Sequence, residues 1–359
     1  FLTAVFMLLG SLVIQAADDG LITKQITIKL DKAGTLSGKI GYNKKRQITN
    51  LKIVGEINGS DLKFVRDMAG GNFRDQGNLS VLDLSEAKII KGGSFYYSND
   101  FYNDEYYTTD DAIGSYAFYE CTGLTSLSLP SGITEINSST FYGCSGLTSL
   151  TIHSGVTEIG SSAFWGCTGL TSLTLPSGIT KIGSYTFSGC TGLTSLTLPS
   201  GITKIDSYAF WGCTGLTSLS LPSSITETGK WAFDGCTGLK DVNFYINGDF
   251  ETYLTKNHPY IGVGCGIKYY LNDEEITSIV VPSSVTTLGM YAFQRCSNLL
   301  SVYVSWPTPI SAYGTFSEAN LGKCTLYVPQ GTEQDYWLAD VWGDFGKIVE
   351  FDATGIDKV

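Results

Sequence analysis

The apolar residues of this chain return at the same places every 23 residues over much of its length. The letters GLTSLTLPSGITKI at 169–182 recur unchanged at 192–205. Each period reads I-x-x-x-A/T-F-x-x-C-x-x-L-x-x-L-x-L-P-x-x-I, and such self-similarity is typical of a solenoid. The repeats begin at Ile113, Ile136, Ile159, Ile182, Ile205 and Thr228, and a seventh begins at Leu288.

Within one period the pattern predicts a strand, a bend and a single helical turn. Leu173 and Leu175 alternate with polar residues, which predicts a short strand buried on one face. Pro176 ends this strand because proline has no N–H for the ladder. The stretch at Ala163-Phe164 is long enough for only one helical or 3₁₀ turn. A lone period buries too little apolar surface to offset its backbone entropy, so periods must stack. We therefore expect an α/β solenoid, a right-handed superhelix of 23-residue rungs with short parallel strands, capped at both ends.

Departures from the period predict how the chain is organised. We expect a secretory signal remnant at 1–17, an N-terminal cap with irregular rungs and a protruding Tyr/Asp-rich loop at 18–112, six regular repeats at 113–244, an insertion with a hairpin around Asn272-Asp273 at 245–275, the seventh repeat at 276–304 and a C-terminal cap at 305–359. In that last cap, Thr332 begins a capping-box-like T-x-x-D before apolar residues at helical spacing, and 348–351 has the pattern of a final strand.

The first residues form an apolar run that is too short to span a bilayer. The run is followed by Ala16 and Ala17 and then by acidic residues, a pattern typical of a signal peptide and its cleavage site. The alternative is a buried N-terminal helix. No later segment is long enough to cross a membrane, so a secreted or surface location is expected.

Charge and motif content exclude several classes of function. The net charge is −11 and no basic stripe is present, which argues against a nucleic-acid partner. The two histidines, His153 and His258, have no neighbouring nucleophile motif, and no metal-binding, phosphate-binding or dinucleotide-binding motif is present. We therefore expect no catalysis, no metal and no cofactor, although a carboxylate pair assembled by folding would escape this reasoning.

The cysteines of the array occupy one position of the period. They are Cys121, Cys144, Cys167, Cys190, Cys213, Cys236 and, later, Cys296. Rungs about 4.8 Å apart would allow disulfides by distance. Parallel side chains that point the same way are poor disulfide partners, which favours a buried ladder of thiols.

Two sets of outward positions could form recognition surfaces. The strands present a lattice of hydroxyls without charge: Ser126, Ser128, Ser149, Thr151, Ser172, Thr174, Ser195, Thr197, Ser218 and Ser220. This lattice can be a soluble β-compatible surface, a protein-docking face or, less plausibly on a curved face, an ice-binding array. Aromatic residues near the helical turns form two columns, Tyr119, Tyr142, Trp165 and Trp211, and Tyr116, Tyr185, Tyr208, Trp231 and Tyr291.

The aromatic columns allow two interpretations. They can simply stack between rungs, or they can form a stripe that binds a protein or a sugar, together with Tyr106 and Tyr107 of the Tyr-rich loop. The sequence alone leaves both open.

The motifs SYAFYECTGLTSLSLPSGI (115–133), SSAFWGCTGLTSLTLPSGI (161–179) and MYAFQRCSNLLSVYV (290–304) closely resemble those of the BspA-like, or treponemal-type, leucine-rich repeat family. The likeness covers roughly residues 113–304, with His153 in place of a repeat proline and an insertion at 245–275. The resemblance implies adhesion to host matrix proteins or to other cells, by anaerobic bacteria.

Together these observations predict a non-catalytic secreted or cell-surface protein that binds an extracellular protein or a glycan. The alternatives are a carbohydrate-binding or carbohydrate-processing surface protein that uses the Tyr-rich loop and the insertion, and a spacer that holds another domain away from the cell.

Overall fold

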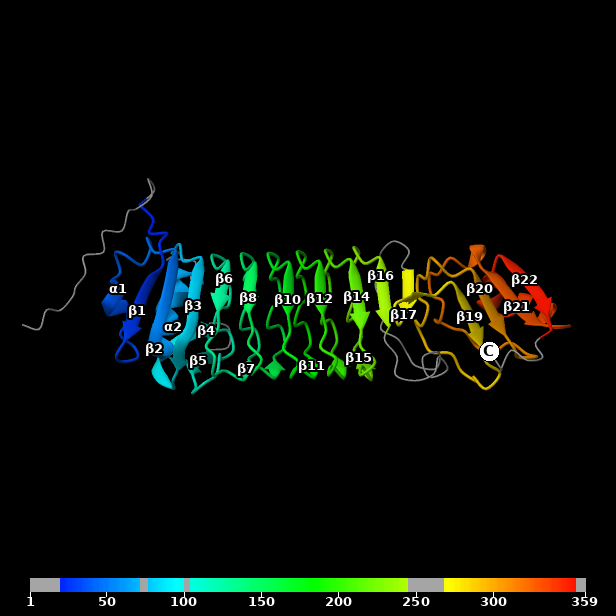
Figure 1. Ribbon diagram of the computed structural model, residues 1–359, viewed down its shortest axis with the longest axis horizontal. Coiled ribbons are helices and arrows are strands. Elements are labelled where there is room, and N and C mark those ends of the chain that lie inside the picture. The colour runs from blue at the N-terminus through cyan, green and yellow to red at the C-terminus, as the bar shows by residue number, and fades with distance from the viewer. Residues whose placement is uncertain (1–19, 72–76, 100–103, 245–267, 353–359) are drawn as a thin grey trace, which may run out of the picture.

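The protein is an elongated solenoid whose rungs lie side by side along the long axis (Figure 1). The structure is a computed structural model that describes residues 20–71, 77–99, 104–244 and 268–352. The expectations for residues 1–17, for most of the insertion and for His258 therefore lie outside the described residues.

Each regular rung contributes a strand to one long face. These strands are β6 (Ser126–Ser128), β8 (Ser149–Thr151), β10 (Ser172–Thr174), β12 (Ser195–Thr197), β14 (Ser218–Leu221) and β16 (Asp241–Phe244). They form a row along one side of the solenoid (Figure 1). Where they pair, they are parallel and one period apart, as in Leu173 with Leu196. The predicted strand is therefore present, and Pro176 follows it closely.

A second row of two-residue strands lies along another side of the rungs, and the sequence pattern did not predict it. It comprises β7 (Glu135–Ile136), β9 (Glu158–Ile159), β11 (Lys181–Ile182), β13 (Lys204–Ile205) and β15 (Glu227–Thr228). In each strand the first residue faces outward or is half-buried, and all but the last bury an isoleucine. Isoleucine, which begins the first five predicted repeats, therefore closes a second wall of the core.

The third side of each rung is the turn that carries the phenylalanine. The N–H of Trp165 donates to the oxygen of Ser162 at 3.1 Å, a 3₁₀-type bond within the turn. The N–H of Phe164 instead donates to the oxygen of Thr186 in the next rung at 2.9 Å. The turn is thus held partly by its own backbone and partly by its neighbour.

A continuous stack of phenylalanine rings fills the core. Phe118, Phe141, Phe164, Phe187, Phe210 and Phe233 are almost fully buried, and consecutive centroids lie 5.1 to 5.5 Å apart. Each phenylalanine packs against the equivalent phenylalanine of the neighbouring rungs, so a side chain that fits one rung fits all of them. This packing explains why the buried residues repeat.

The N-terminal cap contains two helices that the sequence pattern did not predict. Its elements are β1 (Ile26–Leu30), α1 (Leu36–Ile40), β2 (Asn50–Ile57), α2 (Gly59–Met68), β3 (Val81–Ile89), β4 (Gly92–Asn99) and β5 (Asp104–Thr108). β1, β2, β3, β6 and β8 form one parallel sheet. A capping box between Asn58 and Asp61 begins α2. Near its end, buried Arg66 donates to the carbonyl oxygens of Tyr116 and Ala117.

The segment expected to be a protruding loop is a β-hairpin. β4 and β5 pair antiparallel, with Tyr97 opposite Tyr106. Tyr96 is buried and its hydroxyl donates to the oxygen of Ser115 at 2.8 Å. The alternating aromatic residues of this segment place one face against the first regular rung, and that packing favours a hairpin over a loop.

The C-terminal part continues the stack and closes it with aromatic residues. Its elements are β17 (Lys268–Leu271), β18 (Glu274–Glu275), β19 (Ser278–Val281), β20 (Ser301–Val304), η1 (Leu321–Lys323), β21 (Thr325–Pro329), α4 (Glu333–Trp337), η2 (Trp342–Asp344) and β22 (Lys347–Phe351). The predicted hairpin at Asn272-Asp273 is present between β17 and β18, and β22 is the predicted final strand.

The terminal helix is shorter than the apolar spacing suggested. α4 has five residues, and the Thr332 side chain donates to the oxygen of Pro329, so the predicted capping box does not form. Tyr336 and Trp342 are buried, and their polar atoms bond to the oxygens of Trp306 and Ile310. These bonds seal the last rung.

Candidate functional site

The aromatic columns stand on the outer turn of each rung, beside the buried phenylalanine. Residues of the first column follow that phenylalanine directly. Residues of the second column lie three positions earlier and all have a left-handed backbone: Tyr116, Tyr185, Tyr208, Trp231 and Tyr291 have φ between 55° and 64°. A bulky side chain in this conformation costs about 1–2 kcal/mol. The turn thus displays large rings at positions where local backbone preference disfavours them.

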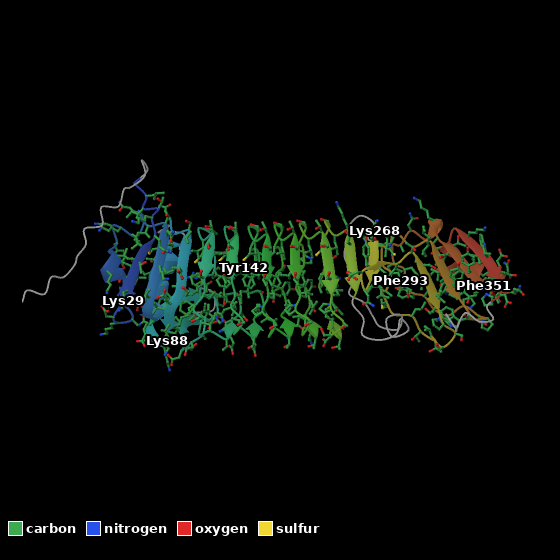
Figure 2. All side chains as sticks on the ribbon, in the orientation of Figure 1. Lys29, Lys88, Tyr142, Lys268, Phe293 and Phe351 are labelled. Carbon is green, nitrogen blue, oxygen red and sulfur yellow. The ribbon has the colours of Figure 1, made fainter. Side chains whose placement is uncertain are left out.

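The first column forms a stack of rings in the first three rungs. The centroids of Tyr119 and Tyr142 are 4.8 Å apart with planes at 13°, and those of Tyr142 and Trp165 are 4.3 Å apart with planes at 14°. Figure 2 labels Tyr142 in this part of the array. Because the rings stack face to face, the inner rings of this ladder present their edges to solvent.

A second stack begins one rung later, in the other column. Tyr185 and Tyr208 are 4.7 Å apart and nearly parallel, and Tyr208 and Trp231 are 5.3 Å apart. Trp211 belongs to the first column but has no ring contact among the described residues. At the same position the two neighbouring rungs carry Ser188 and Asp234, which have no aromatic ring. The Trp211 side chain is 44% exposed.

The hairpin adds two rings to the start of the first stack. Tyr97 stacks on Tyr116 at 4.9 Å, and Tyr106 lies 4.7 Å from Tyr116. With Tyr119 and Tyr142 these residues form what we call the tyrosine cluster: Tyr97, Tyr106, Tyr116, Tyr119 and Tyr142. Three segments of the chain contribute to it.

Tyr107, which the sequence placed with Tyr106, does not join this cluster. Because strand residues alternate in direction, the two neighbours point to opposite faces of the hairpin. The hydroxyl of Tyr107 donates to Glu105 at 2.5 Å, and its ring makes an edge contact with Phe95.

Sequence analysis missed two members of this site, Tyr97 and Glu120. Tyr97 belongs to the segment expected to be a loop. Glu120 could have been found, because the next five rungs carry glycine at its position: Gly143, Gly166, Gly189, Gly212 and Gly235. Burial and the charge of the Glu120 carboxylate raise the pKa of Tyr119. Burial and the same charge raise the pKa of Tyr142.

The cysteine column lies inside the core and not at this surface. Each of its seven cysteines is a buried free thiol. The Sγ of Cys190 donates to the oxygen of Phe164 in the preceding rung at 3.1 Å, and Cys144, Cys167, Cys213 and Cys236 repeat this bond. The thiols thus tie consecutive rungs together as polar groups that are satisfied within the core.

The buried thiols predict alkaline instability. Burial raises the pKa of Cys190 from 9.0 to about 12. Thiols in the unfolded chain release protons at a lower pH than the folded ones, so stability is intact below about pH 9 and falls as pH rises toward 12. We expect the urea midpoint to decrease steadily over this window. The Cys190→Ala variant should show a shallower decrease, and an identical pH profile for the two proteins would contradict the assignment.

The strand face carries the hydroxyl lattice in the predicted orientation. Between β12 and β14 it is hollowed by a cavity of about 460 Å³. Its walls are Ser195, Leu196, Thr197, Leu198, Ser200, Ser218, Ser220, Pro222 and Ser223. None of these residues is charged, so the cavity suits a neutral polar group.

Two further observations concern chemistry. Among the described residues, no group of three or more His, Cys, Asp or Glu side chains could hold a metal ion. In residues 20–71, 77–99, 104–244 and 268–352, no helix combines the length and apolar character of a membrane span. His153 lies in a turn where its Nδ1 accepts from the N–H of Gly155 at 3.1 Å.

Known proteins with similar structures are bacterial leucine-rich repeat proteins. A leucine rich cell surface protein from Faecalibacterium prausnitzii is 21% identical, with 70% of this chain and 86% of that chain covered and a TM-score of 0.37. A leucine-rich repeat protein from Bacteroides ovatus is 20% identical, with 69% and 66% covered and a TM-score of 0.37. The T. pallidum leucine rich repeat protein is 23% identical, with 53% and 72% covered and a TM-score of 0.30.

Sequence comparison assigns the family. Comparison with curated proteins finds no match. The BspA type leucine rich repeat region, in contrast, matches in six copies across residues 69–171, 157–256 and 266–333. These ranges include most of the stacked rungs and extend beyond the resemblance visible in the motifs. The chain belongs to the BspA-type leucine-rich repeat family.

Proposed function

We propose that this protein is displayed on, or secreted from, a bacterial cell and binds another protein without catalysing a reaction. Membership of a repeat family that generally serves as an interaction scaffold supports this proposal. The observation that carries it is the pair of aromatic stacks on the outer turns, the second of which occupies positions of left-handed backbone. The resemblance to BspA-like proteins adds adhesion to matrix proteins or cells as the setting.

The geometry of the stacks favours a protein over a sugar as the partner. A sugar ring packs on the open face of an aromatic ring, but both faces of Tyr142 are covered by Tyr119 and Trp165. What remains exposed is a row of ring edges, hydroxyls and indole groups, which combine apolar contact with hydrogen bonding. Aromatic residues of this kind are enriched at protein interfaces.

Replacing Tyr119, Trp165 and Trp211 together with Ser is expected to abolish partner binding. A protein interface concentrates its affinity in a few aromatic residues, and losing three should weaken binding by at least about a hundredfold. The partner would first be identified by screening the purified chain on arrays of matrix proteins and glycans, and affinity would then be measured by surface plasmon resonance.

The matched control changes the strand face instead. Replacing Thr151, Thr174 and Thr197, which are all exposed, with Lys leaves the turns intact and should preserve binding. If the strand-face variant loses binding while the aromatic variant retains it, the partner uses the other surface. If wild-type protein binds neither array, the spacer role is favoured.

A carbohydrate partner is the second candidate, because two features suit one. Trp211 is not stacked on another ring, so its faces are available to a sugar. The cavity between β12 and β14 offers hydroxyls without charge. In this case Trp211→Ser alone, or Ser218→Trp in the cavity, would remove the glycan-array signals.

A further inference from the structure

The tyrosine cluster contains an acidic residue, Glu120, at a position where the next five rungs carry glycine. Two later rungs carry Arg295 and Glu318 at this position, and these two form an ion pair with each other. Glu120 has φ of 54°, and Gly143, Gly166, Gly189, Gly212 and Gly235 have φ between 69° and 74°. Glycine adopts this conformation without strain, whereas a side chain costs about 1–2 kcal/mol. Strain of this kind is retained mainly where a side chain has a role. The strained backbone at Glu120 therefore suggests that its side chain has a role.

The glycine of the next rung makes room for this side chain. A Cβ at Gly143 would lie only 3.1 Å from the Cγ of Glu120, so Glu120 extends along the array over the second rung. Burial and the negative charge of Glu120 raise the pKa of the hydroxyls of Tyr119, Tyr97 and Tyr142. The carboxylate is thus surrounded by tyrosines.

No basic side chain neutralises this carboxylate among the described residues. Arg66 lies 5.0 Å from the ring centroid of Tyr97. Its guanidinium donates to the backbone oxygens of Tyr116, Ala117 and Gly71. Glu120 is only partly buried, so its charge can reach a binding partner.

The surroundings increase the negative potential at this end of the array. β5 contributes the exposed carboxylates of Asp104 and Glu105, and the whole chain has a net charge of −11. A cation beside this carboxylate gains charge pairing and charge-assisted hydrogen bonds, and the tyrosine hydroxyls at the exposed ring edges offer further acceptors. The charge and the hydroxyls of the site therefore select the same class of group.

We propose that the tyrosine cluster and Glu120 form a docking site for an arginine or lysine side chain in a basic segment of a partner protein. This inference rests on the proposed function and specifies what the start of the first aromatic stack recognises. A bound cation would lie between the Glu120 carboxylate and the exposed edges and hydroxyls of the cluster.

The test is to replace Glu120 with the glycine that the next five rungs carry. Glu120→Gly should weaken binding of a short fluorescent peptide of alternating Arg and Gly by about tenfold or more, measured with the full chain by anisotropy. The same variant should be as stable as wild type or more stable, by relief of strain, so lost binding would not reflect unfolding. Glu120→Gln, which keeps the side-chain size, should weaken binding similarly.

The matched control removes the same charge elsewhere. Glu158→Gln, on the exposed row of short strands, should change peptide affinity by less than about twofold. Equal losses in Glu120→Gly and Glu158→Gln would overturn the proposal, because they would indicate binding to the general negative charge. No binding to wild type would also overturn it. If a partner found on the arrays is lost in the triple aromatic variant but not in Glu120→Gly, the proposed function stands and this inference fails.

Discussion

Replacing Phe187 with Ala is expected to lower the free energy of unfolding by about 3–5 kcal/mol. Phe187 is fully buried and lies between Phe164 and Phe210, at 5.4 and 5.3 Å. Its loss removes ring contacts on both sides and leaves a cavity in the middle of the array. Urea unfolding followed by circular dichroism would measure the change.

An aromatic residue at the surface of the same rung provides the control. Tyr185→Ala removes a ring of similar size that is 39% exposed and stacks only on Tyr208. Position 185 has a left-handed backbone, and the strain there is the same with Tyr as with Ala, so it does not affect the comparison. Its cost should be about 1 kcal/mol. Similar losses in the two variants would mean that the phenylalanine stack is not the main source of stability.

Gly192→Ala is expected to destabilise the protein by about 3 kcal/mol, and more if the rungs cannot separate. A Cβ at Gly192 would lie 2.3 Å from the backbone oxygen of Thr168 in the preceding rung. Neither backbone can move without breaking the hydrogen bonds between rungs. Thermal unfolding should show a lower midpoint for the whole molecule, because each rung is stable only with its neighbours.

Gly189, three residues earlier, tests a different role of glycine. It has φ of 70°, but a Cβ there would meet nothing closer than 3.8 Å. Gly189→Ala therefore adds only backbone strain, about 1 kcal/mol. If Gly189→Ala proves the more damaging of the two, the rungs are not packed as closely as described here.

The 23-residue period was enough to predict the features that the rungs have in common. Core leucines, the buried phenylalanine and cysteine, the strand and the aromatic columns all follow from residues that meet their own copies one rung along. The location of the bend did not follow from the period. Gly169 marks a close approach of two rungs, because a Cβ there would lie 2.6 Å from the oxygen of Ser145. The left-handed bend is at Gly166, where φ is 69°.

Features that occur once were harder to predict. The β4–β5 hairpin depends on contacts between its tyrosines and the first regular rung. The sequence of the hairpin alone is therefore typical of a loop. The helices α1 and α2 are short or have mixed polarity, and their stability comes from packing in the cap. Whether an aromatic ring presents its edge or its face to solvent depends on the rings that stack on it. The period gives only the spacing between these rings along the sequence. Glu120 was visible as an exception, but its tyrosine neighbours became evident only in three dimensions.

The identity of successive rungs has a consequence for how the chain finds its alignment during folding. Because 169–182 and 192–205 carry the same letters, pairing displaced by one whole period would satisfy the same buried contacts and would be a plausible misfolded trap. Only contacts that occur once can distinguish the correct alignment, and each end of the array has such a contact. The Arg66 guanidinium donates to backbone oxygens of the first rung, and the Trp342 indole donates to the oxygen of Ile310. These terminal contacts therefore favour the pairing in which every rung lies in its own register.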